Sequence, residues 1–129
     1  MGMVSFEAFR TVDGTPVYLQ IINFIKRGAI AGTIRDGDEL PSRRVLSALL
    51  GINPNTVQKA FHMLEEEHLM ESRTGAKSCM TLPPDTLDAL RREVLSDELR
   101  AMARTLRQLG ISREEALRLI EQAWKEDEG

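Results

Sequence analysis

One short stretch of the chain, residues 53–64, carries side chains of the types that hydrogen-bond to nucleic acid. At about 100° per residue, a helix over this stretch gathers Asn55, Gln58 and Lys59 on one side, with Thr56 at the boundary. Amide side chains can pair bidentately with adenine, and lysine can donate to guanine or to phosphate. The pattern therefore indicates a helix that offers base-reading groups near its N-terminus. An ordinary amphipathic helix with a solvated polar face is the alternative.

The elements around this helix follow from residues that begin and end helices. Ser42 is a suitable N-cap for a short preceding helix, and Gly51 supplies the turn after it. Asn53 and Pro54 then form an N-cap and first-turn pair for the polar helix. Two helices joined by a tight turn are typical of the helix-turn-helix, whose second helix presents its N-terminal residues to the major groove.

The flanking segments predict one more helix and a small hairpin. Thr15-Pro16 should open a helix from about residue 16 to 31, which Gly32 ends. Residues 69–73 and 78–82 are short enough to be strands, with residues 74–77 as the tip of a hairpin. We therefore predict a mainly α-helical fold, a winged helix-turn-helix of three helices plus a β-hairpin wing, preceded by an extended apolar arm over residues 4–12.

Residues 1–82 carry nine Lys and Arg against nine Asp and Glu and are neutral overall, although the net charge of the whole chain is −3, so any DNA-binding surface must come from local clustering of cations. Residues 83–129 carry eight Lys and Arg against eleven Asp and Glu, so the acidic excess belongs to the C-terminal third. Arg43 and Arg44 begin the first helix of the pair, and Arg73, Thr74 and Lys77 on the wing could reach phosphates or the minor groove. Ordinary solvated charges are the alternative for the wing residues.

The C-terminal third predicts a second domain. Pro83-Pro84 marks the boundary between residues 1–82 and 83–129, and Ser112 with Glu115 forms a capping box for a last helix. The preceding helix has apolar residues spaced four-three-four-three, typical of a helix seam. A hairpin of two helices is too thin to bury itself, so we expect homodimerisation, with packing inside the chain as the alternative. The residues expected at the dimer interface are Leu95, Leu99, Met102, Leu106, Leu109, Leu119, Ile120 and Ala123.

The composition favours a globular protein of the cytoplasm without catalytic chemistry. No apolar run approaches the ~20 residues that cross a membrane, and the N-terminus lacks the pattern of a secretory signal. The one cysteine, Cys79, excludes an internal disulfide framework. His62 and His68 have no companions at metal-ligand spacing, and no phosphate-binding loop or nucleophile elbow occurs. We therefore expect neither an enzyme nor a bound cofactor or metal.

Three motifs occur together over about residues 15–80: Tyr18-Leu19-Gln20-Ile21, Gly37 before Leu40-Pro41-Ser42-x-Arg44-x-Leu46, and Asn53-x-Asn55-Thr56-Val57-x-x-Ala60 with Leu64. In this combination and spacing they resemble the GntR family of bacterial transcription regulators. The short tail of two helices resembles the YtrA subfamily, whose members lack the large effector-binding domain of other branches.

The resemblance implies dimerisation through the C-terminal helices and, commonly, repression of neighbouring transporter genes. Two positions depart from the family pattern: His68 stands where a glycine usually precedes the wing, and Lys77 replaces the second glycine of the G-x-G in the wing. The DNA contacts that the resemblance implies come from Ser42, Arg44, Asn55, Thr56, Lys59, Arg73 and Gly75.

We therefore expect a homodimeric DNA-binding transcription regulator, a repressor at an inverted repeat, and a small-molecule effector is compatible with this assignment. The alternative is a protein–protein interaction module, which the slightly acidic net charge favours. The full set of candidate DNA-binding residues is Ser42, Arg43, Arg44, Asn53, Asn55, Thr56, Gln58, Lys59, Arg73, Thr74, Gly75 and Lys77.

Overall fold

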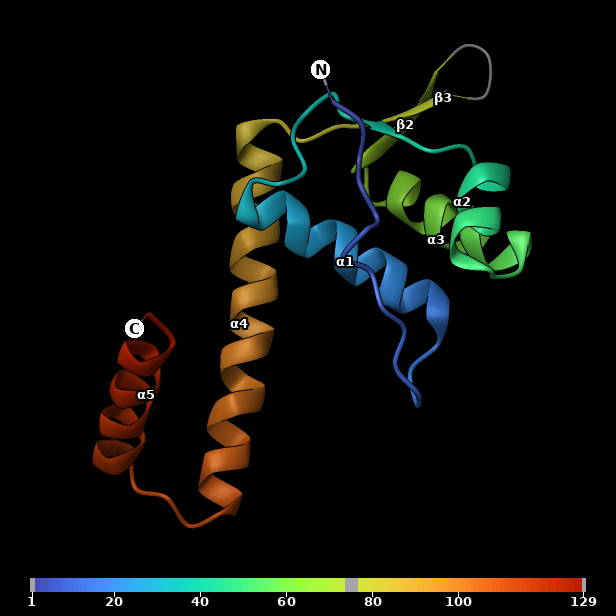
Figure 1. The fold of residues 1–129 in the computed structure, drawn as a ribbon. Helices are drawn as coiled ribbons and strands as arrows, with labels where there is room; N and C mark the ends of the chain where they lie inside the picture. The colour runs from blue at the N-terminus through green and yellow to red at the C-terminus, as the bar shows by residue number, and fades with distance from the viewer. Residues whose placement is uncertain (1, 74–76, 129) are drawn as a thin grey trace. The chain divides into compact units, whose positions relative to one another are not determined.

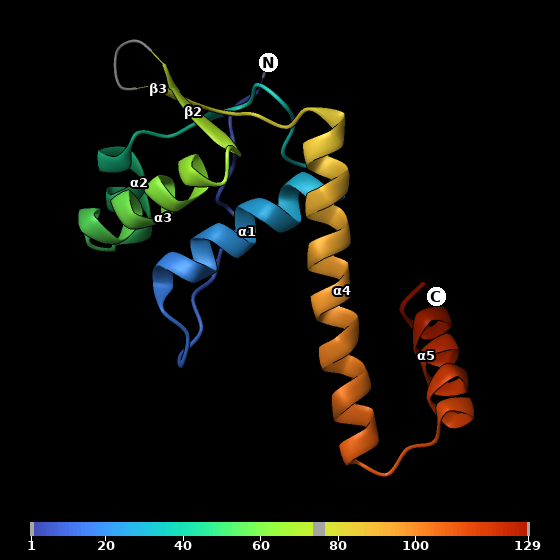
Figure 2. The ribbon, with the colours of Figure 1, turned by 180° about the vertical axis from the view of Figure 1, so that it is seen from behind.

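The computed structural model describes residues 2–73 and 77–128, most of which are helical (Figures 1 and 2). This part of the chain confirms the predicted winged helix-turn-helix followed by two helices. In chain order the elements are α1 (Val17–Ala31), β1 (Glu39–Leu40), α2 (Arg43–Leu50), α3 (Pro54–Glu66), β2 (Met70–Arg73), β3 (Lys77–Met80), α4 (Pro84–Gln108) and α5 (Arg113–Glu128).

The chain divides into two compact units, Met1–Arg91 and Arg92–Gly129. The division falls inside α4 rather than at Pro83-Pro84, where the sequence predicts a domain boundary. The first turns of α4 belong to the first unit, in which Leu90 is buried. A helix can cross such a boundary because its backbone hydrogen bonds are all internal to it.

The core of the first unit forms where α3 packs against α1 and α2. Each fully buried aliphatic or aromatic side chain there contributes about 1.5–3 kcal/mol relative to its exposed state. Because α3 directs its apolar side inward, its polar side stays exposed, as the two-sided pattern predicts. The largest fully buried side chains are Ile21, Ile25, Leu46, Val57, Phe61, Leu64 and Met80.

The predicted caps begin both helices of the helix-turn-helix. Ser42 Oγ accepts a hydrogen bond from the backbone N–H of Val45 at 3.2 Å, and Asn53 Oδ1 accepts from that of Asn55 at 2.8 Å. Gly51 ends α2 in the left-handed region, with a φ of 65°. The turn geometry that orients α3 is therefore set by local side-chain chemistry.

The start of α1 differs from the prediction that Thr15 caps it. Pro16 occupies the N-cap position, and no side-chain hydrogen bond caps the helix. The side chain of Gln20 reaches back instead, and its Nε2 donates to the carbonyls of Val12 and Thr15 at 2.9 and 2.7 Å. A long amide one turn into the helix thus holds the preceding segment, a role that cap preferences do not indicate.

The sheet has three strands in the order β1-β3-β2, all antiparallel, and includes one strand that the sequence did not predict. This strand, β1, is only two residues long, too short for an alternating pattern. The N-terminal arm adds a parallel bridge beside it, because the N–H of Val4 donates to the carbonyl of Glu39 at 2.8 Å. As predicted, the arm packs apolar side chains on the domain: the rings of Phe6 and Phe9 lie 5.2 and 5.4 Å from that of Phe24.

His68, where the resembling family usually has glycine, ends α3 in the left-handed region with a φ of 63°. Its N–H donates to the carbonyl of Glu65 at 3.0 Å, and the N–H of Leu69 donates to that of Leu64 at 2.9 Å. This pair of bonds is a Schellman motif, in which the residue at His68 must adopt positive φ. A Cβ at such a position costs about 1 kcal/mol, so the departure from glycine should have a measurable effect on stability.

Replacing His68 by glycine should therefore stabilise the first unit by about 1 kcal/mol. Chemical or thermal denaturation would measure the change. The control is Gly51→Ala, which places a Cβ at a φ of 65° where nothing lies within 4 Å, and which should destabilise by a similar amount. A loss of stability in His68→Gly would show that the imidazole contributes contacts that outweigh the backbone strain.

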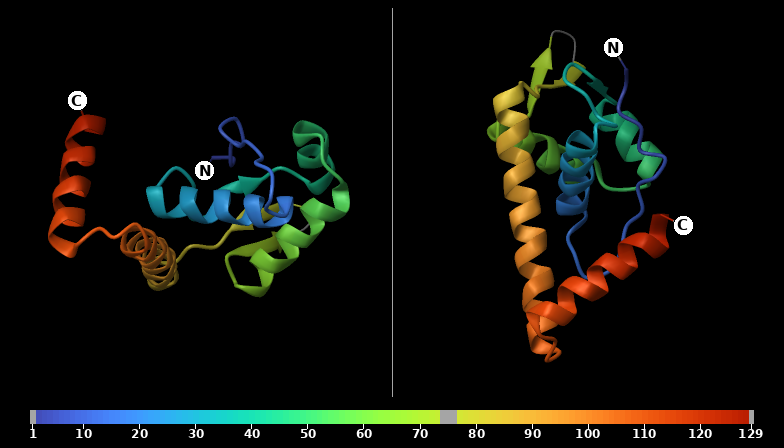
Figure 3. Two further views of the ribbon diagram at one scale, coloured as in Figure 1. Left: turned by 90° about the horizontal axis from the view of Figure 1, so that it is seen from below. Right: turned by 90° about the vertical axis from the view of Figure 1, so that its left-hand side faces the viewer.

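The second unit holds the C-terminal part of α4 and all of α5. Gly110, with a φ of 76°, ends the first helix, and Ser112 Oγ accepts from the N–H of Glu115 at 3.2 Å, as the capping box predicts. The helices diverge from this turn (Figure 3), and none of the residues of α5 is buried. The apolar side chains of this hairpin are therefore left largely uncovered within one chain.

Candidate nucleic-acid interface

The exposed side of α3 carries the polar residues that the sequence singled out. Asn55, Gln58 and Lys59 are exposed and Thr56 is half-buried, all in the first two turns of the helix. Their amide, hydroxyl and ammonium groups can donate to or accept from base edges, and the rigid core beneath holds the helix axis. The N-terminal half of α3 thus has the chemistry and the exposure of a recognition helix.

Lys59 has a partner that the spacing of residues did not indicate. Its Nζ lies 4.1 Å from the centre of the Tyr18 ring, which α1 contributes. A cation over an aromatic face gains about 0.5–1 kcal/mol at exposed sites, enough to favour one direction of a flexible side chain. The only sign of this contact in the sequence is that Tyr18 belongs to the motif shared with the resembling family.

The two arginines at the start of α2 have different surroundings. Arg44 is exposed, whereas the guanidinium of Arg43 lies 5.7 Å from the centre of the Phe61 ring. Nη2 of Arg43 also lies 3.4 Å from Oε1 of Glu65. The half-buried side chain of Arg43 thus has contacts within the protein, whereas that of Arg44 is exposed.

The wing contributes two exposed cations from adjacent strands. Arg73 of β2 and Lys77 of β3 are paired in the sheet register. Each lies 4.0 Å from one exposed carboxylate, Arg73 from Glu71 and Lys77 from Glu39. Exposed pairs of this kind contribute little, so either cation could exchange its carboxylate for a phosphate. The predicted contacts Thr74 and Gly75 lie outside the described residues.

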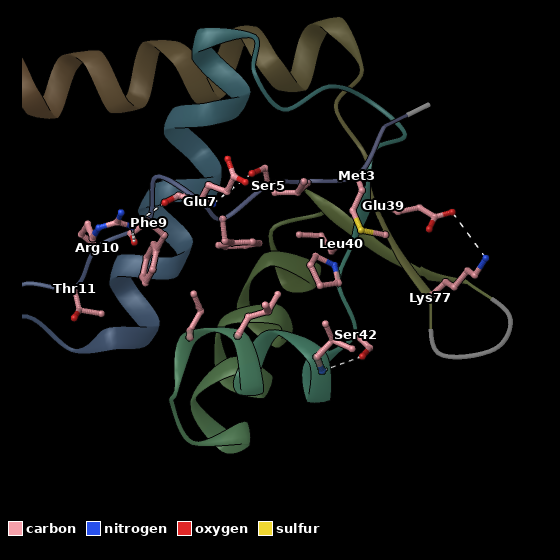
Figure 4. A pocket seen from close by; sticks show the side chains of 16 residues that line it. Met3, Ser5, Glu7, Phe9, Arg10, Thr11, Glu39, Leu40, Ser42 and Lys77 are labelled. Carbon is pink, nitrogen blue, oxygen red and sulfur yellow. Dashed lines mark hydrogen bonds and ion pairs between the residues drawn. The ribbon is translucent and has the colours of Figure 1, made fainter.

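A groove of about 860 Å³ between the N-terminal arm and α2 shows how the start of α2 and the wing are placed (Figure 4). Ser42 and Lys77 lie toward the same end of this groove, and Arg10 lies toward the other.

The two capping residues, Ser42 and Asn53, keep donors that could reach phosphate. Each uses a side-chain oxygen to cap its helix, so the hydroxyl hydrogen of Ser42 and the amide NH₂ of Asn53 can still donate to phosphate.

Other chemistry has little support in residues 2–73 and 77–128. No group of three or more His, Cys, Asp and Glu residues there could hold a metal ion, and Cys79 is a buried free thiol. Two acidic residues between α1 and β1 have structural uses: Asp38 is buried and accepts from the N–H of Arg35 at 2.8 Å, and Asp36 accepts from that of Leu82 at 2.7 Å. No helix in the same ranges is long and apolar enough to span a bilayer.

Comparison with known proteins shows that the chain is similar to bacterial transcription regulators. Residues 17–77 match the family described as bacterial regulatory proteins, gntR family. The chain is 28% identical over 102 residues to the HTH-type transcriptional regulator YhcF of Bacillus subtilis, and that alignment covers 79% of this chain and 84% of YhcF. It is 43% identical over 63 residues to the HTH-type transcriptional repressor YtrA of the same organism, and that alignment covers 49% of this chain and 48% of YtrA.

A solved structure resembles the chain over more of its length. A GntR family transcriptional regulator from Listeria monocytogenes superposes with a TM-score of 0.79 at 27% identity, covering 87% of this chain and 98% of that one. The similarity therefore extends beyond the helix-turn-helix into the C-terminal helices. These relatives are transcription regulators rather than enzymes.

Proposed function

We propose that this chain, whose residues 17–77 match the gntR family of bacterial regulatory proteins, is a DNA-binding regulator that acts as a homodimeric repressor at an inverted-repeat operator. The observation that carries the proposal is the exposed row of amide, hydroxyl and ammonium groups on the first two turns of α3. By occupying the operator, such a dimer would block polymerase.

The residues divide into those that read bases and those that position the protein on the duplex. Asn55, Thr56 and Gln58 would contact base edges in the major groove, where amides distinguish adenine. Arg44 and Lys59 would contact phosphates, which fix the register of the protein without reading sequence. The cations and donors that would complete the phosphate contacts are Ser42, Asn53, Arg73 and Lys77.

Uncovered apolar surface in the second unit supports the dimer. Leu99 is 61% exposed and Trp124 is 68% exposed, and none of α5 is buried. A groove of about 510 Å³ opens between α4 and α5, lined by Leu99, Met102, Leu106 and Ile120 among others. Because a second copy carries the same helices, a two-fold arrangement would cover both apolar surfaces at once.

Selection of bound duplexes from a random DNA pool, at about physiological salt, tests the proposal. A dimer with two recognition helices should recover an inverted repeat whose half-sites are centred about 34 Å apart, one helical turn. Recovery of a single unrepeated site would contradict the dimer, and recovery of random sequence would contradict sequence-specific reading.

Gln58→Ala should relax the selected sequence at one base position in each half-site. The loss of a bidentate amide contact costs about 1–3 kcal/mol at that position and leaves the neighbouring positions unchanged. Repeating the selection with this variant, and titrating matched and mismatched duplexes, measures the change. Equal losses on selected and random DNA would exclude a base-reading role for Gln58.

The alternative is that the winged helix binds a protein partner, which the net charge of −3 favours. The salt dependence of DNA affinity distinguishes a DNA-binding function from a protein-binding one. Each phosphate contact releases counterions, so DNA affinity that depends on several contacts falls steeply with salt concentration. A flat salt dependence of weak DNA binding would favour the protein partner.

A further inference from the structure

A carboxylate near the C-terminal end of α3, that of Glu65, connects three elements of the winged helix-turn-helix. Its Oε1 accepts a hydrogen bond from Ser72 Oγ of β2 at 3.1 Å. The same oxygen lies 3.4 Å from Nη2 of Arg43, the first residue of α2. One oxygen of α3 thus binds both the start of α2 and the first strand of the wing.

Arg43 is anchored at this position by several contacts. Its guanidinium lies against the Phe61 ring, and its Nε is buried without a hydrogen-bond partner in the described residues. Leaving a donor buried and unpaired is unfavourable, so the contacts with Glu65 and Phe61 offset that cost. Arg43 therefore connects α2 with α3 through the Glu65 carboxylate and the Phe61 ring.

Glu65 itself lies far from the end of α3 that would read bases. At 1.5 Å per residue it is roughly 15 Å along the helix axis from Asn55. Direct approach of its carboxylate to a phosphate would be repulsive. Any favourable effect of Glu65 on DNA binding must therefore act through α2 and β2.

We propose that Glu65 is a positioning residue that holds the start of α2 and the wing at a set orientation to α3, and that DNA affinity depends on this. The cations it would orient follow its two partners directly in the chain: Arg44 follows Arg43, and Arg73 follows Ser72. The inference rests on the proposed function, because it requires α2, α3 and the wing to contact one duplex.

The sign of the effect of Glu65→Ala distinguishes positioning from simple electrostatics. Removing a negative charge would by itself strengthen DNA binding. Positioning predicts the opposite, a loss of about three- to ten-fold, because a charge-assisted hydrogen bond that orders two cations is gone. The measurement is a titration of a labelled duplex that the unaltered protein has selected, at a temperature where thermal unfolding shows every variant folded.

Glu66→Ala is the matched control, since it removes the same charge one residue later. The carboxylate of Glu66 lies 2.7 Å from Nε2 of His62 on the same helix and connects no other element in that contact. This variant should bind DNA as tightly as the unaltered protein or more tightly. Binding by Glu65→Ala that equals or exceeds that of Glu66→Ala would overturn the proposal.

Ser72 offers a test without any change of charge. Ser72→Ala removes the hydroxyl from an exposed strand position and should also weaken binding several-fold. Ser72→Thr keeps a hydroxyl and should restore the affinity. Because both substitutions break the same hydrogen bond, Glu65→Ala combined with Ser72→Ala should cost less than the two single effects together. Full additivity would contradict a shared role.

Failure of the proposed function would look different from failure of this inference. If the proposed function is wrong, the unaltered protein itself will select no duplex from the pool. Amide hydrogen exchange in the free protein then decides the inference: β2 (Met70–Arg73) should exchange faster in Glu65→Ala and Ser72→Ala than in Glu66→Ala. Equal exchange in all three variants would show that Glu65 does not hold the wing.

Discussion

Arg44→Ala should weaken binding to the selected duplex by about 10- to 100-fold, because it removes a charge-assisted phosphate contact from each half of a dimer. Arg44 is exposed in the first turn of α2, so its removal should leave the free energy of unfolding nearly unchanged. Titrations over a range of salt should also show a shallower dependence, because each phosphate that is no longer neutralised reduces the log–log slope by about 0.9.

The neighbouring Arg43 is the internal control for this prediction. Arg43→Ala should lower the free energy of unfolding, because the side chain no longer packs on Phe61. It should weaken DNA binding by no more than Glu65→Ala does. Its salt dependence should match that of the unaltered protein, because its guanidinium is already paired with Glu65. If Arg43→Ala flattened the salt dependence and Arg44→Ala did not, the phosphate contact would belong to Arg43.

Leu99→Asp should convert the dimer into monomers and weaken binding to the inverted repeat by about 100-fold or more. A charge placed in an apolar interface is strongly unfavourable without a partner. Dissociation of the dimer then removes the avidity of two linked half-site contacts, which is commonly about 10²- to 10⁴-fold. Sedimentation or light scattering would report the mass, and titration of full and half operators the affinity.

Ala101→Asp is the matched control, with the same new residue on the same helix about 200° around its axis from Leu99. Ala101 is exposed, so this variant should remain dimeric and bind as before. A dimer that persists in Leu99→Asp would contradict the proposed interface. A monomeric Leu99→Asp that kept full affinity for the inverted repeat would show instead that DNA binding does not require the dimer.

The helix ends show how much of the fold follows from local sequence. Ser42, Asn53 and Gly51 act within a few residues of their own position, so their caps and turns could be predicted from residue types alone. The two sides of α3 likewise follow from helical periodicity, which separates Gln58 from Val57 without knowledge of the partner helix. Local chemistry and periodicity therefore sufficed for the two helices of the helix-turn-helix and for the exposed row on α3, but not for the two-residue strand β1.

Contacts between elements could be identified only from the packed structure. Periodicity could not tell which of Arg43 and Arg44 turns inward, because that depends on where the Phe61 ring and Glu65 lie after α2 packs on α3. The partnership of Lys59 with Tyr18 spans 41 positions of chain and depends on how α1 crosses α3. The crossing of helices is set by the shapes of many side chains together, so such partners emerge only when the core has formed.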